Sequence, residues 1–245
     1  MNGGGSRIDG ISAALAESGT DICVLSEYTK ASSERLIHSL AARGFVHQLH
    51  TEPAEFWGGV LVASRGPIER GDVDNCPSPD RWLHVVVKNA AIEIGAAYIP
   101  NSERSRDEKS AYWNWLLEVG SKLLHRAALI GGDFNTGLPN VDENGATLVC
   151  ANAMQQMLMS GWTDLWRRAN PQVRESSWWS SSGNGFRLDH AFASPTVVPK
   201  FRAAEYLTKV NDRCVVHPRR IGDDCGAKPL SDHSMLRIDL ALEKS

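Results

Sequence analysis

Acidic and amide side chains stand next to apolar runs at several points of this sequence. They are Glu27, Asp133, Asn135, Asp189 and the pair Asp232-His233. A carboxylate beside a buried strand is costly unless it is paired, hydrogen-bonded or bound to a metal. Each of these residues alone is explained as a turn residue or a helix cap, because Asp and Asn cap helices routinely. Together they indicate one polar site.

The donors in this set are carboxylates, an amide and an imidazole, with no cysteine as a companion ligand. Hard oxygen donors of this kind suit Mg²⁺ or Mn²⁺ better than zinc. Asp189 is a candidate to orient the imidazole of His233. The pattern therefore predicts a site for a hard divalent cation beside a histidine held by a carboxylate.

The periodicity of apolar residues predicts the elements that carry these side chains. Helical spacing covers 7–18, 33–42, 105–125 and 146–160, and strand-like runs cover 21–25, 45–49, 58–64, 83–88, 91–99, 127–132, 162–166, 177–179, 187–193 and 235–241. The segment 65–80 is expected to be a charged turn, because it contains three prolines. No repeat or linker divides the chain, which predicts one α/β domain over 1–245 with mixed or antiparallel sheets.

The composition is that of a globular protein. Of 245 residues, 42% are hydrophobic and 22% are charged, and 26 Lys and Arg against 29 Asp and Glu give a net charge of −3. These values exclude a wholly disordered or collagen-like chain, and they argue against a strongly basic, non-specific nucleic-acid binder. The longest apolar runs, such as 59–63, fall far short of the roughly 20 residues that a membrane helix needs.

The cysteines indicate a reducing environment. Their number, five, is odd and no Cys-x-x-Cys occurs, so a disulfide framework or a zinc ribbon is not expected. Cys214 and Cys225 flank a basic loop; the ten residues between them allow a disulfide, but in a reducing compartment we expect both to be free thiols. The first residues lack the basic and apolar regions of a signal peptide. We therefore expect a monomer in the cytoplasm with no membrane partner.

In their order, the motifs resemble those of the endonuclease/exonuclease/phosphatase superfamily, and most closely its exonuclease III and AP endonuclease branch. The matching segments are 1–3, 25–27, 58–64, 98–101, 132–135, 161–167, 187–189 and 231–233. They cover essentially the whole chain. The resemblance implies an α/β (α+β) fold, a four-layer sandwich of two packed mixed β-sheets flanked by helices, with the site at one edge.

The resemblance also implies catalytic roles for five residues. Asp133 is similar to the aspartate that orients or deprotonates the attacking water, and Asn135 to the residue that hydrogen-bonds the phosphate oxygens. His233 would contact the phosphate as charge develops, and Asp189 would hold His233 in its tautomer. Tyr98 resembles the tyrosine that reaches the phosphate.

The metal ligands implied by the resemblance are Glu27, Asp232 and Asn2, with Mg²⁺ or Mn²⁺ as the cofactor. Asn2 departs from the family pattern, in which a first strand ends in Asn-x-Asn-Gly. Its spacing to Glu27 fits the second Asn of that motif, which would place the first strand upstream of Met1; in a slipped alignment Asn2 serves as the first Asn. We therefore expect that the domain lacks the family's first strand, which would expose a sheet edge.

The expected substrate contacts come from the segments that resemble the AP endonuclease branch. They are Asn101, Trp178, Asn184, Phe186 and Arg187. Asn101 occupies the position at which the resemblance places a His in phosphatase-like members. Trp178 and Phe186 resemble the aromatic wall of a pocket for a flipped, baseless sugar. Strand alternation predicts that one of Trp178 and Trp179 packs in the core.

These features predict a metal-dependent phosphodiesterase that acts on DNA as an AP endonuclease or 3′-exonuclease. The segments 136–161 and 180–188 are shorter than in exonuclease III, which weakens the abasic-site interpretation. Basic residues between Arg104 and Lys109 and between Lys200 and Arg220 either contact backbone phosphates or form a solvated face. Two alternatives stay open: a phosphatase or phosphodiesterase for a small or lipid phosphate ester, and a non-catalytic relative that binds nucleic acid.

Overall fold

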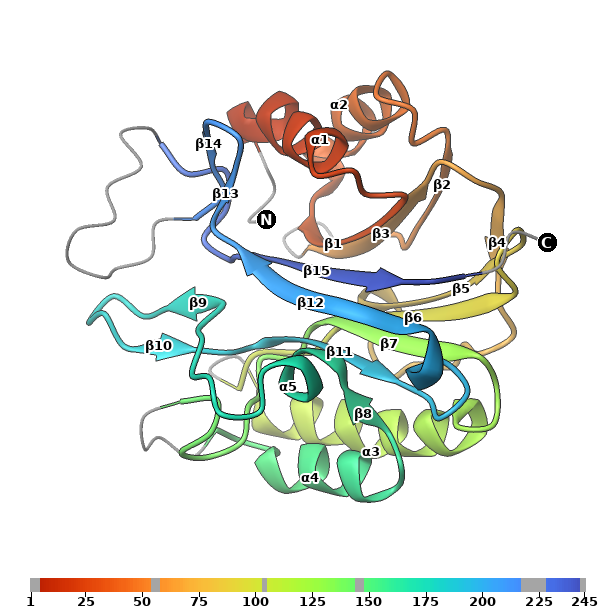
Figure 1. The fold of residues 1–245 in the computed structure, drawn as a ribbon, viewed down its shortest axis with the longest axis vertical. Helices are drawn as coiled ribbons and strands as arrows, with labels where there is room; N and C mark the ends of the chain where they lie inside the picture. The colour runs from red at the N-terminus through yellow and green to blue at the C-terminus, as the bar shows by residue number, and fades with distance from the viewer. Residues whose placement is uncertain (1–4, 54–57, 103–104, 144–147, 217–227, 243–245) are drawn as a thin grey trace.

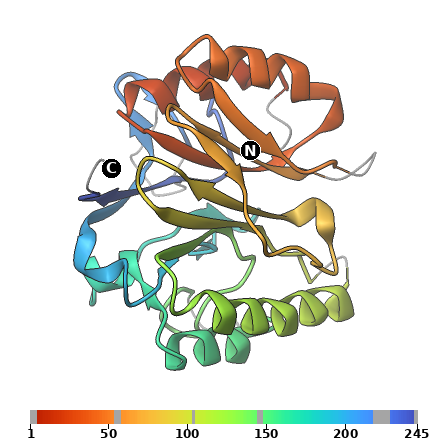
Figure 2. The same cartoon turned by 90° about the vertical axis from the view of Figure 1, so that its right-hand side faces the viewer.

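The computed structural model describes residues 5–53, 58–102, 105–143, 148–216 and 228–242. Its layers follow in the order helices, sheet, sheet, helices (Figures 1 and 2). The four-layer sandwich implied by the motifs is therefore confirmed. The predicted helix over 146–160 begins partly outside the described residues, and Asn2 lies outside them altogether.

The first sheet has three antiparallel strands in the order β1-β3-β2. They are β1 (Ile22–Tyr28), β3 (Gly59–Ser64) and β2 (His47–His50). Every residue of β3 is buried, because this strand lies between two others and under helices on one face. The covering helices are α1 (Ile8–Glu17), which follows the short η1 (Gly5–Arg7), and α2 (Lys30–Ala41).

The second sheet has six strands in the order β4-β5-β6-β7-β11-β8. They are β4 (Ile68–Arg70), β5 (Trp82–Val87), β6 (Ile92–Tyr98), β7 (Ala128–Asp133), β11 (Asp189–Ala193) and β8 (Thr163–Asp164). Among the described strands, β6 and β7 alone pair in parallel, and α3 (Arg106–Leu123) lies between them in the chain. Helices α3 and α4 (Ala151–Met159) cover the outer face of this sheet (Figure 2). The short η2 (Pro79–Arg81) precedes β5.

Three strand pairs complete the fold. A longer pair joins β12 (Phe201–Leu207), which follows η3 (Val198–Lys200), to β15 (Met235–Leu240). Two short hairpins join β9 (Trp178–Trp179) to β10 (Gly185–Phe186) and β13 (Lys209–Val210) to β14 (Arg213–Cys214). The β9–β10 hairpin projects beyond the sandwich (Figure 1), which explains why Trp178 and Trp179 are both only half-buried and the alternation argument was wrong.

Several elements differ from the periodicity predictions. The segment predicted as a strand over 162–166 continues into helix α5 (Leu165–Ala169), because the carboxylate of Asp164 caps it by accepting from the Arg167 N–H at 3.0 Å. The charged turn over 65–80 contains the short edge strand β4. Strand β12 was not predicted, since three of its seven residues are exposed and the sequence gives no clear alternation.

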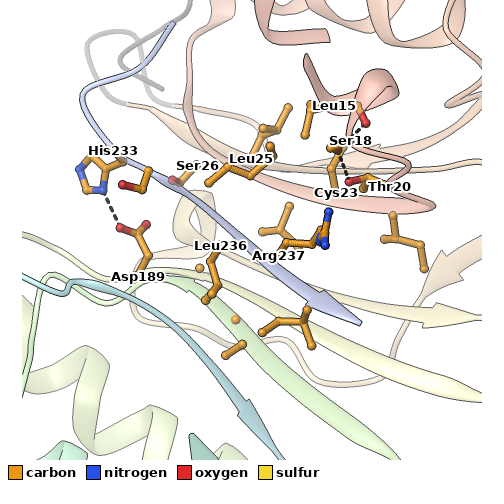
Figure 3. Close-up of a pocket in the computed structure, with 18 of the residues that line it drawn as sticks. Leu15, Ser18, Thr20, Cys23, Leu25, Ser26, Asp189, His233, Leu236 and Arg237 are labelled. Carbon is orange, nitrogen blue, oxygen red and sulfur yellow. Dashed lines mark hydrogen bonds and ion pairs between the residues drawn. The ribbon is translucent and has the colours of Figure 1, made fainter. Parts of the chain in front are cut away.

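A cleft separates β1 from β15. Within the described residues, β1 pairs only with β3 and β15 only with β12. In Figure 3, Ser26 lies toward His233 while Cys23 lies toward Arg237, so the two strands run in opposite directions along the cleft. Its volume is about 460 Å³, and apolar side chains of both strands and of the six-stranded sheet line it, among them Val24, Leu25, Ile94, Leu129, Leu236 and Ile238.

The cysteines differ in part from expectation. Cys23, Cys76 and Cys150 are free thiols, and the first two are buried. Cys214, which is also buried, is disulfide-bonded, so the expected free thiol at this position is wrong. Spacing along a loop does not report whether two sulfur atoms meet in the fold. In the part of the chain that the structure describes, no helix combines the length and the apolar character needed to span a membrane.

Candidate active site

Strand register places three of the predicted residues side by side. Tyr98, the last residue of β6, pairs with Asp133, the last residue of the parallel strand β7. Asp133 in turn pairs with Asp189, the first residue of the antiparallel strand β11. Register partners on neighbouring strands present their side chains on the same face. The three side chains therefore share one face at one edge of the six-stranded sheet.

His233 reaches this edge from the segment before β15. Its backbone forms an antiparallel bridge with Trp178, and its Nδ1 lies 2.8 Å from Oδ2 of Asp189 (Figure 3). Burial acts to lower the pKa of His233, but the charge and hydrogen bond of Asp189, aided by the charge of Asp133, raise that pKa to about 9. The imidazole is therefore a cation at neutral pH, with Nε2–H as its second donor.

Asp133 is the most deeply buried carboxylate of the group, with 3% of its surface exposed. The backbone N–H of Asn135 donates to its Oδ1 at 2.8 Å, and the Asn135 side-chain amide donates to its Oδ2 at 3.0 Å. Burial raises the pKa of Asp133, the charge of His233 opposes that rise, and the net pKa is about 7. Oxygens of Asp133 and Asp189 and a ring nitrogen of His233 all lie within 4.8 Å of one another.

Asn135 turns back on this group through a left-handed backbone conformation, with φ of 46°. Its amide nitrogen donates to Asp133 and also, at 3.0 Å, to the carbonyl of Ile99. Both amide hydrogens are thus engaged within the protein. The predicted contact with phosphate oxygens requires that one of them exchanges its partner.

Glu27 faces the group from the other sheet. The hydroxyl of Tyr98 donates to its Oε1 at 2.9 Å, and its charge acts to raise the pKa of Asp133. Glu27 has φ of 62° and sits at a bulge between β1 and β3. A Cβ atom at Gly58 would lie 2.3 Å from the Glu27 Cα, so this approach of the two chains requires glycine.

The predicted metal ligands do not all gather here. Asp232 is exposed, and it is not part of the close group formed by Asp133, Asp189 and His233. Alternation along the chain explains this, because the bridge that turns His233 toward Asp189 turns its neighbour the other way. With Asn2 outside the described residues, Glu27 is the one predicted ligand that the structure places at the site.

A second group of acidic and imidazole atoms lies elsewhere, at Asp72, His84 and Glu93. Arg126 already neutralises it, donating to Asp72 at 2.7 Å and to Glu93 at 3.2 Å. The Nδ1 of His84 accepts the N–H of Val73 at 3.1 Å. The polar atoms of this group already form hydrogen bonds that join strands and loops, so we assign the group a structural role.

Comparison with known proteins agrees with this geometry. The model of the endonuclease/exonuclease/phosphatase family matches residues 1–233. The chain belongs to this family. No match was found among curated protein sequences. The resemblance read from the motifs is therefore confirmed at the level of the family, whose members are hydrolytic nucleases and phosphatases.

Solved structures show the same fold at low sequence identity. A 3′ phosphatase from Neisseria bound to a product DNA hairpin has a TM-score of 0.79 and 19% identity over 98% of this chain and 96% of its own. A 3′-5′ exonuclease from Neisseria meningitidis gives the same values. An AP endonuclease from Archaeoglobus fulgidus has a TM-score of 0.77 and 18% identity, covering 99% of this chain and 97% of its own.

In this family member an aromatic wall stands beside His233. The rings of Trp178 and Phe186 face each other across the β9–β10 hairpin with centroids 5.8 Å apart, and the Trp178 ring is 6.5 Å from that of His233. Asn184 is exposed at the turn of the same hairpin, and Asn101 is exposed beyond the end of β6. These four predicted contacts are all accessible to a ligand.

Arg187 is not accessible, and the prediction that it contacts substrate is corrected. It is 1% exposed, its Nε donates to Asp142 at 2.7 Å, and its Nη2 donates to Asp164 at 2.6 Å. Arg187 precedes the regular strand β11, which begins at Asp189, so strand alternation does not fix the direction of its side chain, and its ion pairs draw it into the protein. The buried ion pairs tie the segment before β11 to Asp164 of β8 and to the loop that carries Asp142.

Sequence reasoning missed two residues at this site. The Ser177 hydroxyl, fully buried, accepts the backbone N–H groups of Leu188 at 2.9 Å and of Asp189 at 3.1 Å, which fixes the start of β11. Lys109, expected on the surface, is 1% exposed, and its ammonium donates to the carbonyl of Asn135. No local motif marks Ser177, but a lysine at a buried helical position could have been recognised from the apolar spacing of 105–125.

Proposed function

We propose that this protein is a divalent-metal-dependent phosphodiester hydrolase that acts on DNA, as an AP endonuclease or a 3′-exonuclease. The observation that carries the proposal is the close group of Asp133, Asp189 and His233 facing the Glu27–Tyr98 pair. It sets a buried base, a cationic donor and an anionic ligand around one point. That combination suits attack of water on an anionic phosphate.

The residues present fit Mg²⁺ or Mn²⁺. Glu27 offers a carboxylate oxygen, and three carboxylates, Glu27, Asp133 and Asp189, raise the negative potential at one edge while His233 offsets only part of it. A hard cation with oxygen ligands matches this donor set. When bound, it would neutralise phosphate charge and stabilise the oxygen that leaves.

The protein's own side chains then have separate tasks. Asp133, held by two hydrogen bonds from Asn135, accepts a proton from the attacking water. His233 donates its Nε2–H to a non-bridging phosphate oxygen as negative charge accumulates there. Asp189 fixes the imidazole by accepting from Nδ1, so that Nε2 faces the substrate. A P–O bond forms to water as the bond to the leaving alkoxide breaks.

DNA is the proposed substrate because of the wall beside this group. Trp178 and Phe186 present aromatic faces next to His233, which suits a flipped sugar or an unstacked base. Asn101 is exposed where a phosphatase-like histidine would stand. The Neisseria relative holds a DNA hairpin, which supports the same class of substrate.

A cleavage assay tests the proposal. The purified protein is given two labelled duplexes, one with a single abasic site and one intact, each with Mg²⁺, Mn²⁺ or EDTA. We expect metal-dependent cleavage that Asp133→Asn reduces about 10³-fold. Asp107→Asn, an exposed carboxylate on α3, is the matched control and is expected to act like the wild type.

The outcomes separate the alternatives. Cleavage of the abasic duplex alone supports the AP endonuclease activity, and shortening of both duplexes from their 3′ ends supports the exonuclease. A folded protein that binds Mn²⁺ and cleaves neither duplex contradicts a DNA substrate and favours a small or lipid phosphate ester. Binding of DNA without metal binding or cleavage would identify a non-catalytic relative.

A further inference from the structure

Lys109 is a buried cation outside the catalytic group. It lies in the first turn of α3, its surface is 1% exposed, and its ammonium donates to the backbone carbonyl of Asn135. Among the described residues it forms no ion pair with a carboxylate. The burial rules out the phosphate contact that its place among basic residues suggested.

The stability of the fold does not explain this cation. Burial lowers the pKa of Lys109 to about 8, although the neighbouring Cys150 and Asp133 act to raise it. An apolar side chain of similar length would fill the same space without the cost of removing an ammonium from water. A buried charge that costs stability and serves one carbonyl therefore calls for a functional explanation.

The carbonyl that Lys109 holds belongs to the turn at the catalytic base. In the left-handed conformation of Asn135, the N–H and the side-chain amide point to Asp133 while the carbonyl points to α3. A non-glycine residue keeps such a conformation only where its surroundings enforce it. The bond from Lys109 is the contact that fixes the carbonyl side of this turn.

We propose that Lys109 is a positioning residue, whose ammonium holds Asn135 in the turn that aims its N–H and amide at Asp133. This inference rests on the proposed hydrolase function. It predicts that loss of the cation slows the chemical step, because the base and the amide lose their shared geometry. Substrate binding, which depends on the aromatic wall and on phosphate contacts elsewhere, is expected to change little.

The kinetic test compares Lys109→Met with Lys109→Arg and Lys109→Gln. We expect Lys109→Met to lower kcat about 10- to 100-fold with KM within about threefold of the wild type. Its unfolding temperature is expected to stay close to that of the wild type, because relief of the buried ammonium offsets the loss of a donor to the Asn135 carbonyl, and this separates positioning from a structural role. Lys109→Arg, which keeps a charged donor, should recover more activity than Lys109→Gln. The control is Lys122→Met, an exposed lysine of the same helix.

A second readout does not need the reaction. In protein labelled with ¹⁵N-asparagine, the backbone and side-chain signals of Asn135, assigned with Asn135→Ser, are expected to shift or broaden in Lys109→Met and to return in Lys109→Arg. Unchanged Asn135 signals, or a Lys109→Met enzyme with wild-type kcat, would overturn the assignment. If the wild type cleaves no DNA, the proposed function fails, and the Asn135 signals still decide the positioning role.

Discussion

The hydroxyl of Tyr98 donates to Oε1 of Glu27 at 2.9 Å and so connects the end of β6 in one sheet to β1 in the other. The guanidinium of Arg81 lies over the Tyr98 ring, 4.3 Å from its centroid, and holds the ring from its face. Glu27 is thereby fixed by a tyrosine that is itself fixed. The proposed metal ligand is therefore oriented before a cation binds.

Tyr98→Phe is therefore expected to weaken Mn²⁺ binding about tenfold, because Glu27 without its orienting hydrogen bond loses more conformational entropy when it binds the cation. Titration calorimetry measures the affinity. Ser194→Ala is the control, since its buried hydroxyl also donates a hydrogen bond, to the backbone carbonyl of Arg126 at 2.7 Å, and it follows the end of β11 opposite to Asp189. That variant should lose some stability and keep its Mn²⁺ affinity. Equal affinity of Tyr98→Phe and wild type would show that Glu27 needs no such support.

The rate of cleavage is expected to depend on pH in two steps. Asp133 must be ionised to accept a proton, so kcat/KM rises as the pH passes its pKa of about 7. His233 must be protonated to donate, so kcat/KM falls as the pH passes its pKa of about 9. A cation bound beside Glu27 favours the ionised form of Asp133, so raising the metal concentration should move the acidic limb to lower pH.

Asp189→Asn assigns the alkaline limb. It removes the charge that raises the pKa of His233, so the alkaline limb should move to lower pH while the acidic limb moves less. The profile from pH 5 to 10, measured with Asp107→Asn alongside, gives both limbs. An alkaline limb that stays in place would mean that another group than His233 is the donor.

Arg187→Met is expected to destabilise the protein by roughly 3–5 kcal/mol, because it removes the cation shared by the buried Asp142 and Asp164 and leaves only Arg167, at 3.2 Å, beside Asp142. Urea unfolding measures this loss, and the exposed Arg168→Met serves as the control. Replacing both carboxylates by Asn in the same variant should recover part of it. A stable Arg187→Met enzyme with a raised KM would instead support the contact between Arg187 and substrate that its burial argues against.

Trp178→Ala is expected to raise the KM for an abasic duplex about tenfold, because the ring is an accessible stacking surface beside His233. Trp179→Ala is a matched control from the same two-residue strand. Successive side chains of a strand point to opposite faces, so Trp179 is expected to point away from the face of Trp178. Steady-state kinetics give the KM values, and fluorescence anisotropy with labelled duplexes compares the DNA affinities of the two variants. Equal effects on abasic and intact DNA would assign the wall to general DNA binding and not to recognition of a missing base.

The cleft between β1 and β15 predicts that the fold accepts a further strand between them. A seven-residue apolar strand fused ahead of the N-terminus is expected to pair with both open edges and to raise the unfolding temperature by about 5 °C. The same extension with a central proline, which cannot complete the ladder, should have no effect. Equal melting of both fusions would show that the cleft does not accept a strand.

The sequence predicted the order of most elements because the strands are short apolar runs and the helices keep a helical spacing of apolar residues. It failed where one residue decides the outcome: the carboxylate of Asp164 starts α5 inside a strand-like run, and the exposed residues of β12 hide its pattern. The periodicity also located the strand ends that carry Tyr98 and Asp133. Strand register decides which of these side chains are in contact, and the local spacing of residues does not determine the register between distant strands.

The same limit explains the site residues that differed. Arg187 belongs to a motif that also holds Asp189, yet Arg187 bonds to the buried Asp142 while Asp189 bonds to His233 at the site. Lys109 belongs to a basic segment, and only the packing of α3 against the Asn135 turn shows that it is buried. A motif identifies neighbours along the chain, whereas chemistry depends on neighbours in space.

Gly58 bears no functional group, yet any side chain there would collide with the backbone of Glu27. A survey of natural or laboratory variants should consequently find this position as intolerant as those of the acids and the histidine. Its intolerance would be inherited from Glu27, whose unusual backbone it accommodates. Mutational sensitivity in this protein would thus mark the scaffold of the reaction as sharply as its chemistry.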